Sequence, residues 1–171
     1  MKDLKKYIRD VPDFPKEGIL FKDITTLIGN KDAFKEVVDN LIGRYKGKGI
    51  DAIVAAEARG FIIGGAVAYG LGIKFVPVRK KGKLPYKTIG VTYELEYGTD
   101  SLYMHEDGIA PGDNVLVMDD LLATGGTAKA ICELVEKLKG KVSEIAFMIE
   151  LSDLRGREKI KGYNIYSQVV Y

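Results

Sequence analysis

The sequence predicts an α/β protein built on an open, mostly parallel twisted sheet that is flanked by helices. Short apolar runs, typical of buried strands, recur along the chain, and segments with helical periodicity separate them. Strand–turn–helix–strand units of this kind build parallel sheets. A length of 171 residues suits one core, so we expect a single domain over residues 1–171.

The N-terminal part of the chain contains one well-marked helix. Residues 2–9 are expected to form a short helix, and two prolines then impose extended or turn backbone. Apolar side chains recur at helical spacing over residues 30–46. Asn30 is a suitable N-cap, and two glycines follow the last turn.

The remaining elements alternate between strand and helix. Strands are expected at 50–56, 73–78, 114–118, 142–150 and 163–170, and helices at 61–71 and 127–139. Two segments fit this core poorly, residues 10–28 and residues 79–106. We expect the first to be a small N-terminal hood. The second is expected to be a flexible lid loop that leads into an extended arm over residues 89–97.

Composition and charge exclude several classes of protein. The formal net charge is +2, which gives no general case for nucleic-acid binding. Cys132 is the one cysteine, so no internal disulfide can form. The N-terminus is charged, and no apolar run reaches the roughly 20 residues that span a bilayer. We expect a cytoplasmic protein with neither a nucleic-acid nor a membrane partner.

The most informative stretch joins an expected strand to an expected helix. Four apolar residues precede Asp119 and Asp120, at the point where open α/β sheets place their ligands. A loop with two glycines and two threonine hydroxyls then opens a helix, which suits a phosphate dianion. The carboxylates suit the vicinal hydroxyls of a sugar. Together they predict a site for ribose 5-phosphate. A merely solvated acid pair would leave the loop unexplained, and a Walker loop would need a lysine that is absent here.

This stretch resembles the phosphoribosyl pyrophosphate (PRPP) motif of the type I phosphoribosyltransferase family. The resemblance implies that the loop holds the 5-phosphate of PRPP and that Asp119 and Asp120 face its ribose hydroxyls. The implied phosphate ligands are Ala123, Thr124, Gly125, Gly126 and Thr127.

A second small-residue loop follows the strand at 50–56. From the residues alone, Arg59 is equally well a surface side chain or a bidentate phosphate ligand. The loop also resembles the pyrophosphate loop of the same family, where a non-proline cis peptide is common. The resemblance implies pyrophosphate binding by Glu57, Ala58 and Arg59, a catalytic role for Arg59, and a cis peptide near Glu57–Ala58.

A basic run at residues 79–83 admits three interpretations: a solvated turn, a nucleic-acid site, or a lid that neutralises pyrophosphate. The run and the segment 93–98 resemble the adenine-specific branch of the family. That likeness implies a closing loop whose Arg79, Lys80 and Lys83 approach pyrophosphate. Glu96, on the arm, is a candidate for moving the proton at N9 or N7 of adenine, with an exposed strand glutamate as the equal alternative.

The segment from Phe14 to Ile24 resembles the hood of the same branch. From pattern alone, its phenylalanines are core residues. The resemblance implies that Leu20 and Lys22 bind adenine through main-chain atoms and that Phe21 stacks on the base.

Three further features received simpler interpretations. His105, the one histidine, is expected to be a strand residue that is either hydrogen-bonded or exposed, and Cys132 is expected to be an apolar filler of a helix. Residues 154–159 also match the family, but nothing in the sequence suggests what they do.

The resemblance implies a pentosyltransferase of purine salvage that converts adenine and PRPP to AMP and pyrophosphate. It implies a homodimer, and Mg²⁺ bound through pyrophosphate and the ribose hydroxyls. The alternatives are an enzyme for another purine, such as xanthine, and a PRPP-sensing regulator, for which the chain offers neither a second domain nor a broad basic face.

Overall fold

The computed structural model describes residues 3–94 and 98–171, and the chain divides into two compact units, Met1–Arg44 and Tyr45–Tyr171. The N-terminal unit contains the 3-10 helix η1 (Leu4–Tyr7), strands β1 (Arg9–Val11) and β2 (Phe21–Asp23), helix α1 (Thr25–Ile28) and nearly all of helix α2 (Lys31–Tyr45). Strands β1 and β2 pair antiparallel. The single-domain prediction stays a prediction.

The first residues differ from the expected helix over 2–9. Only one 3-10 turn forms, and β1 begins at Arg9. The reason is a long-range contact, because Arg9 pairs with Asp23 of β2 and its Nη2 lies 2.5 Å from the Asp23 carboxylate. The expected N-cap of α2 is present, since Asn30 Oδ1 accepts a hydrogen bond of 3.0 Å from the Ala33 N–H.

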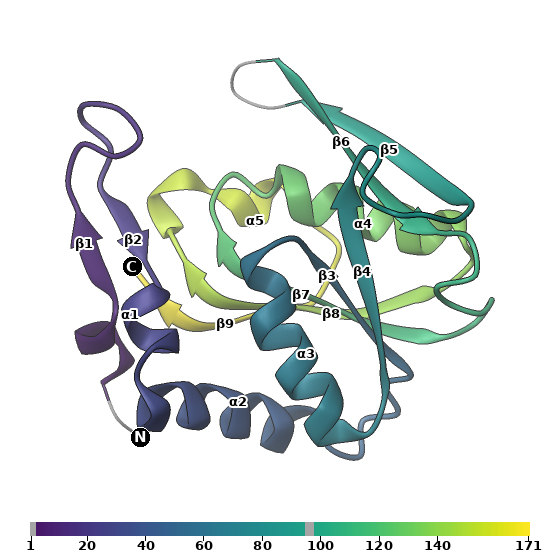
Figure 1. Ribbon diagram of the computed structural model, residues 1–171, viewed down its shortest axis with the longest axis horizontal. Coiled ribbons are helices and arrows are strands. Elements are labelled where there is room, and N and C mark those ends of the chain that lie inside the picture. Colours follow the sequence, from purple (N-terminus) through teal and green to yellow (C-terminus); the bar gives the residue numbers. More distant parts are fainter. Residues whose placement is uncertain (1–2, 95–97) are drawn as a thin grey trace. The chain divides into compact units, whose positions relative to one another are not determined.

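The C-terminal unit is built on a seven-stranded sheet of order β5-β6-β4-β3-β7-β8-β9 (Figure 1). Its strands are β3 (Ala52–Ala56), β4 (Lys74–Lys80), β5 (Thr88–Glu94), β6 (Thr99–His105), β7 (Asn114–Leu122), β8 (Lys141–Glu150) and β9 (Ile165–Val170). The five strands from β4 to β9 in this order are parallel. Strands β5 and β6 add an antiparallel hairpin at one edge.

Helices cover both faces of this sheet. On one face, α3 (Arg59–Leu71) lies so close that a Cβ at Gly64 would be 3.2 Å from Ala55 Cβ. On the other face, α4 (Gly126–Lys137) joins the main core cluster through side chains such as Ile131, together with Val54 and Val117. Residues 53 and 55 thus face α3 while residues 52, 54 and 56 face α4, as the alternation along a strand requires. The short elements η2 (Ser152–Leu154) and α5 (Gly156–Lys159) precede β9.

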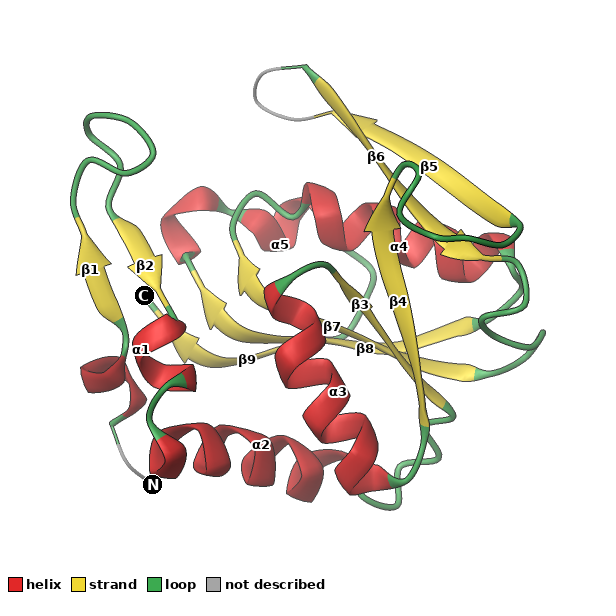
Figure 2. Cartoon of the chain, in the orientation of Figure 1, coloured by secondary structure: helices red, strands yellow, loops and turns green. Residues whose placement is uncertain are grey.

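Two strand predictions are corrected by the sheet. The arm expected over 89–97 is one strand of a hairpin, whose second strand β6 was not predicted (Figure 2). The strand expected over 114–118 continues to Leu122, because its pairing with β8 runs on from Asp119↔Phe147 to Leu122↔Glu150. Asp119 and Asp120 therefore lie within β7 and not beyond its end. None of the helices described is both long and apolar enough to cross a bilayer.

Candidate active site

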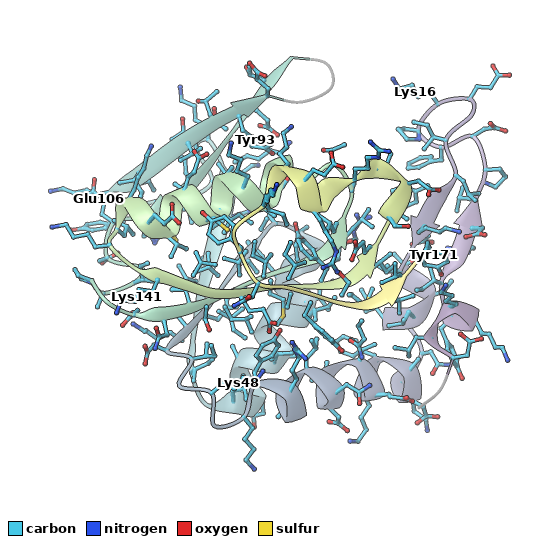
Figure 3. The ribbon with its side chains drawn as sticks, turned by 180° about the vertical axis from the view of Figure 1, so that it is seen from behind. Lys16, Lys48, Tyr93, Glu106, Lys141 and Tyr171 are labelled. Carbon is cyan, nitrogen blue, oxygen red and sulfur yellow. The ribbon has the colours of Figure 1, made fainter. Side chains whose placement is uncertain are left out.

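The predicted phosphate loop connects β7 to α4. Gly125 is the N-cap of α4 and has the left-handed φ of 82°, which an L side chain rarely adopts. The loop and the first turn of α4 surround a small cavity of about 60 Å³. Tyr93 of the hairpin reaches this turn, with its hydroxyl 3.4 Å from Thr127 Oγ1 (Figure 3). The first backbone N–H groups of a helix have no hydrogen-bond partner within the helix, so a helix N-terminus suits a phosphate.

Asp119 and Asp120 have different partners. The Asp120 N–H donates a hydrogen bond of 2.9 Å to Asp119 Oδ1. Burial of the carboxyl group, and then the neighbouring charge of Asp120, raise the pKa of Asp119 well above its ordinary value. Asp120 is buried, and its Oδ2 lies 2.6 Å from Arg59 Nε. The acid pair is therefore tied directly to the second loop.

The second loop contains the expected cis peptide, between Glu57 and Ala58. Strands β3 and β7 are parallel neighbours, with Ala55 opposite Met118, so both loops leave the same edge of the sheet. A Cβ at Gly60 would lie 2.9 Å from Asp119 Oδ1. Only glycine at this position lets the start of α3 approach the acid pair so closely.

Two cations of the basic run, Arg79 and Lys80, are paired with carboxylates. Glu57 accepts a hydrogen bond of 2.8 Å from Arg79 Nη2 and one of 2.7 Å from the Lys80 N–H. The bond from Lys80 lowers the pKa of Glu57 more than any other contact. Lys80 Nζ lies 3.0 Å from Asp100, which raises the pKa of Lys80. The Lys83 carbonyl accepts a bond of 3.2 Å from Arg79 Nη1.

The predicted base-binding residues belong to the N-terminal unit. Leu20 is exposed, and the ring of Phe21 meets Phe14 edge to face with centroids 5.1 Å apart. Lys22 Nζ lies 2.6 Å from Asp10 across the two-stranded sheet. The binding of adenine by the main chain of Leu20 and Lys22 stays a prediction.

Three other predicted residues have different outcomes. Glu96 lies outside the described residues. Cys132 is fully buried in α4, and burial raises its thiol pKa to about 12, so it is the inert filler that the sequence indicated. His105 is a residue of β6 whose ring meets Tyr86 edge to face. Its Nε2 is buried without a hydrogen-bond partner among the described residues, so the expectation of a hydrogen-bonded or exposed histidine is wrong at this atom.

The contact between α5 and the phosphate loop was not predicted from the sequence. A Cβ at Gly156 would lie 2.3 Å from the Ala123 carbonyl oxygen, so α5 starts directly against the phosphate loop. Next to it, Arg157 makes a two-point contact with Glu150. The motif at 154–159 was the only signal in the sequence, and it carried no hint of this neighbour.

Comparison with known proteins decides the family. The family model of the phosphoribosyl transferase domain matches residues 23–168. The chain belongs to this family. Within it, the chain is 57% identical to an adenine phosphoribosyltransferase of Brachyspira hyodysenteriae, over 99% of each sequence.

Solved structures agree with this assignment. A crystal structure of adenine phosphoribosyltransferase from Thermoanaerobacter pseudethanolicus has a TM-score of 0.96 at 50% identity, covering 99% of this chain and 98% of that one. The enzyme from Saccharomyces cerevisiae, complexed with an imino-altritol bisphosphate and adenine, has a TM-score of 0.91 at 40% identity, covering 97% and 96%. The comparisons confirm the predicted phosphoribosyltransferase fold. They also confirm the predicted activity, that of an adenine phosphoribosyltransferase of purine salvage, which is a pentosyltransferase.

Proposed function

We propose that this member of the phosphoribosyltransferase family transfers the 5-phosphoribosyl group of PRPP to adenine, giving AMP and pyrophosphate. One observation carries the proposal: a phosphate-type loop, a buried acid pair and a cis-peptide loop converge at one edge of a parallel sheet. Such a site matches a ligand with a phosphate at one end, a diol in the middle and a second phosphate group beyond.

The proposed roles follow from this geometry. Residues 123–127 bind the 5-phosphate through backbone N–H groups and threonine hydroxyls. Asp119 and Asp120 accept hydrogen bonds from the ribose hydroxyls, which favour the ionised form of Asp119, and the negative charge of the pair then stabilises the cationic ribose of the transition state. The position of Arg59, 2.6 Å from Asp120, supports its contact with the departing pyrophosphate.

In this proposal, the basic side chains Arg79 and Lys80 of the lid exchange their carboxylate partners for pyrophosphate. Arg79 is paired with Glu57, and Lys80 is paired with Asp100. Pyrophosphate carries more charge than either carboxylate and competes for both side chains, with Lys83 nearby. Glu57 thereby places the cations before the substrate arrives. Closure of the lid excludes water, which would otherwise capture the cationic ribose.

Adenine is selected by the N-terminal unit in this proposal. Phe21 offers a flat apolar face, and the main-chain atoms of Leu20 and Lys22 contact the base edge. Glu96 relays the proton that adenine loses from N9.

Magnesium fits this site only together with the substrate. Across residues 3–94 and 98–171, no group of three or more His, Cys, Asp or Glu side chains is arranged to hold a metal ion. Asp120 is already paired with Arg59, so the acid pair is no ready chelate. Asp119 and Asp120 would contact the ion through the ribose hydroxyls. Bound there, Mg²⁺ would neutralise charge on the leaving pyrophosphate.

We also propose that the chain is a cytoplasmic homodimer. The outer side of α3 carries Ile62 and Tyr69, and Tyr69 is 91% exposed. An apolar helical stripe of this kind is typical of a surface that a second copy covers.

A competition assay tests the proposed function. The protein receives PRPP, Mg²⁺ and equal amounts of adenine, hypoxanthine, guanine and xanthine, and the nucleotide products are separated. AMP as the sole product is the expected result. Formation of another nucleotide would still support the PRPP site, but it would overturn the assignment of adenine as the base. PRPP binding without any nucleotide product would favour the regulator.

A further inference from the structure

The segment Arg155–Lys159 touches the phosphate loop backbone to backbone. A Cβ at Gly156 would lie 2.3 Å from the Ala123 oxygen and 2.7 Å from Leu122 Cδ1. A Cβ at Gly125 would lie 2.5 Å from the Gly156 oxygen. Each glycine is therefore required by the other side of the contact. A shift of α5 cannot leave the loop unmoved.

Arg157 fastens this segment to the sheet. Its Nε lies 2.7 Å from Glu150 Oε1 and its Nη2 lies 2.7 Å from Glu150 Oε2, a two-point pairing of guanidinium and carboxylate. The Glu150 carboxylate is only 7% exposed, and the bond from Arg157 lowers its pKa despite burial. Since Glu150 is buried, its charge depends on this one guanidinium and on nearby Ser167.

Glu150 occupies the strand position that fixes the loop. It is the last residue of β8 and is paired with Leu122, the last residue of β7, after which the phosphate loop begins. The next residue, Leu151, donates a hydrogen bond of 3.0 Å to the Leu122 carbonyl. Arg157 thus joins α5 to the strand ends from which the loop departs.

We propose that Arg157 is a positioning residue for PRPP, which acts through Glu150 and Gly156 to hold the phosphate loop in its binding geometry. This inference rests on the proposed function of the loop. A site made of backbone N–H groups has no side chain that can adjust to a displaced phosphate. Its affinity therefore depends on the rigidity of the backbone around it.

The test compares Arg157→Gln, Arg157→Lys and Gly156→Ala with two matched controls. Lys74→Gln removes one partner of another ion pair, with Asp113, next to the opposite ends of the strands. Gly43→Ala adds a methyl group in helix α2, where no described heavy atom beyond the adjacent residues and the local helix backbone lies within 4 Å of the new Cβ. For each variant we would measure the PRPP dissociation constant by calorimetry with Mg²⁺, the KM for adenine at saturating PRPP, kcat, and the thermal midpoint.

Arg157→Gln and Gly156→Ala are expected to raise the dissociation constant of PRPP about tenfold or more, because small displacements at a site are costly. The KM for adenine should change less than about twofold, since adenine does not contact the loop in the proposed function. Arg157→Lys should be intermediate, because lysine keeps the charge but not the two-point geometry. Both controls should bind PRPP as the wild type does.

A folded Arg157→Gln that binds PRPP normally would overturn the inference, as would an equal loss in Lys74→Gln. If Arg157→Gln does not fold, Arg157→Lys and Gly156→Ala decide, and normal PRPP binding in both would overturn it. A wild-type chain that binds no PRPP would overturn the proposed function and this inference together. Normal wild-type binding with unaffected variants would overturn the inference alone.

Discussion

Asp119 and Asp120 are neighbours in the chain, yet the fold gives them different electrostatic environments. Asp120 has the Arg59 guanidinium 2.6 Å away, whereas burial and the charge of Asp120 raise the pKa of Asp119. The folded state therefore disfavours the charged form of Asp119 until a ligand supplies hydroxyl donors. A residue that costs stability for the sake of a ligand is typical of a functional site.

Asp119→Asn is expected to separate stability from activity. Because folding raises this pKa, the ionised carboxyl destabilises the protein increasingly as pH rises above the ordinary value of 3.8 through the raised value. At pH 7 the variant should be at least as stable as the wild type, because it lacks the buried charge. Its turnover should fall about 100-fold or more. Chemical unfolding at pH 4 and 7, with steady-state kinetics, measures both. Wild-type turnover would remove Asp119 from the mechanism.

Asp23 shows the opposite behaviour in the N-terminal unit. Its carboxylate accepts hydrogen bonds from Arg9, from the Thr25 N–H at 2.9 Å and from Thr25 Oγ1 at 2.8 Å. The Arg9 bond contributes most, and together these contacts lower the pKa of Asp23 to about 2. These contacts therefore stabilise the folded state fully above pH 3.8, the ordinary pKa of an aspartate, and the stabilisation is lost as the pH falls towards 2.

Asp23→Asn should accordingly destabilise the protein by about 1.5 kcal/mol at pH 7, the scale of hydrogen bonds to a charged group. The difference from wild type should shrink between pH 4 and pH 2. Urea unfolding across this range measures it. Asp39→Asn, which removes an exposed ion pair with Lys35, is the control and should cost less than about 0.5 kcal/mol. A deficit of Asp23→Asn that is independent of pH would contradict the argument.

Among the elements, the phosphate loop is the one where backbone conformation matters most. Gly125 combines a φ of 82° with a neighbour, the Gly156 oxygen, that a Cβ would approach to 2.5 Å. Gly112 shares the positive φ, at 90°, but no described heavy atom lies within 4 Å of its Cβ position. Substitution of Gly112 therefore tests backbone strain alone, whereas substitution of Gly125 tests strain together with a steric clash.

Gly125→Ala is expected to raise the KM for PRPP at least about tenfold, since the loop must move away from α5. Gly112→Ala should lose about 1 kcal/mol of stability through strain alone and keep its KM for PRPP. Steady-state kinetics and thermal unfolding of both variants make the comparison. Equal KM values in the two variants would show that the contact with Gly156 is unimportant for binding.

Over the whole molecule, the proposed duties are divided between two compact units. The candidates for base recognition lie within Met1–Arg44, and those for phosphate and ribose lie within Tyr45–Tyr171. The family model, which matches residues 23–168, includes parts of both. In the proposed function, selection of the purine and activation of PRPP therefore belong to different compact units of one chain.

The proposed dimer makes a prediction at the same scale. Tyr69→Glu places a charge on the exposed apolar side of α3 and should shift the protein from dimer to monomer, because an unpaired buried charge is costly. Val170→Glu, at a half-exposed apolar position of β9, is the control and should stay dimeric. Sedimentation equilibrium distinguishes the two. A monomeric wild type would refute the proposed dimer.

Features that depend on neighbouring residues were predictable from the sequence. The parallel core, the cap at Asn30 and the glycine-rich loop before α4 follow from local chemistry or from short motifs. The cis peptide after β3 was implied by the resemblance to the family. The interpretation of Cys132 was equally local, since its position on the apolar side of a helix predicts burial. Local pattern determines these features because backbone conformation and hydrophobic periodicity are set within a few residues.

Only the tertiary structure decided which distant residues meet. Strand β6 and the true end of β7 depend on pairing partners far along the chain. The same holds for Glu57 with Arg79, for Asp100 with Lys80, and for Gly156 against the phosphate loop. The sequence by itself determined the chemistry of the proposed ligand and the loops expected to bind it. The fold decided how those loops are held, because contacts between remote segments depend on packing, which no local pattern encodes.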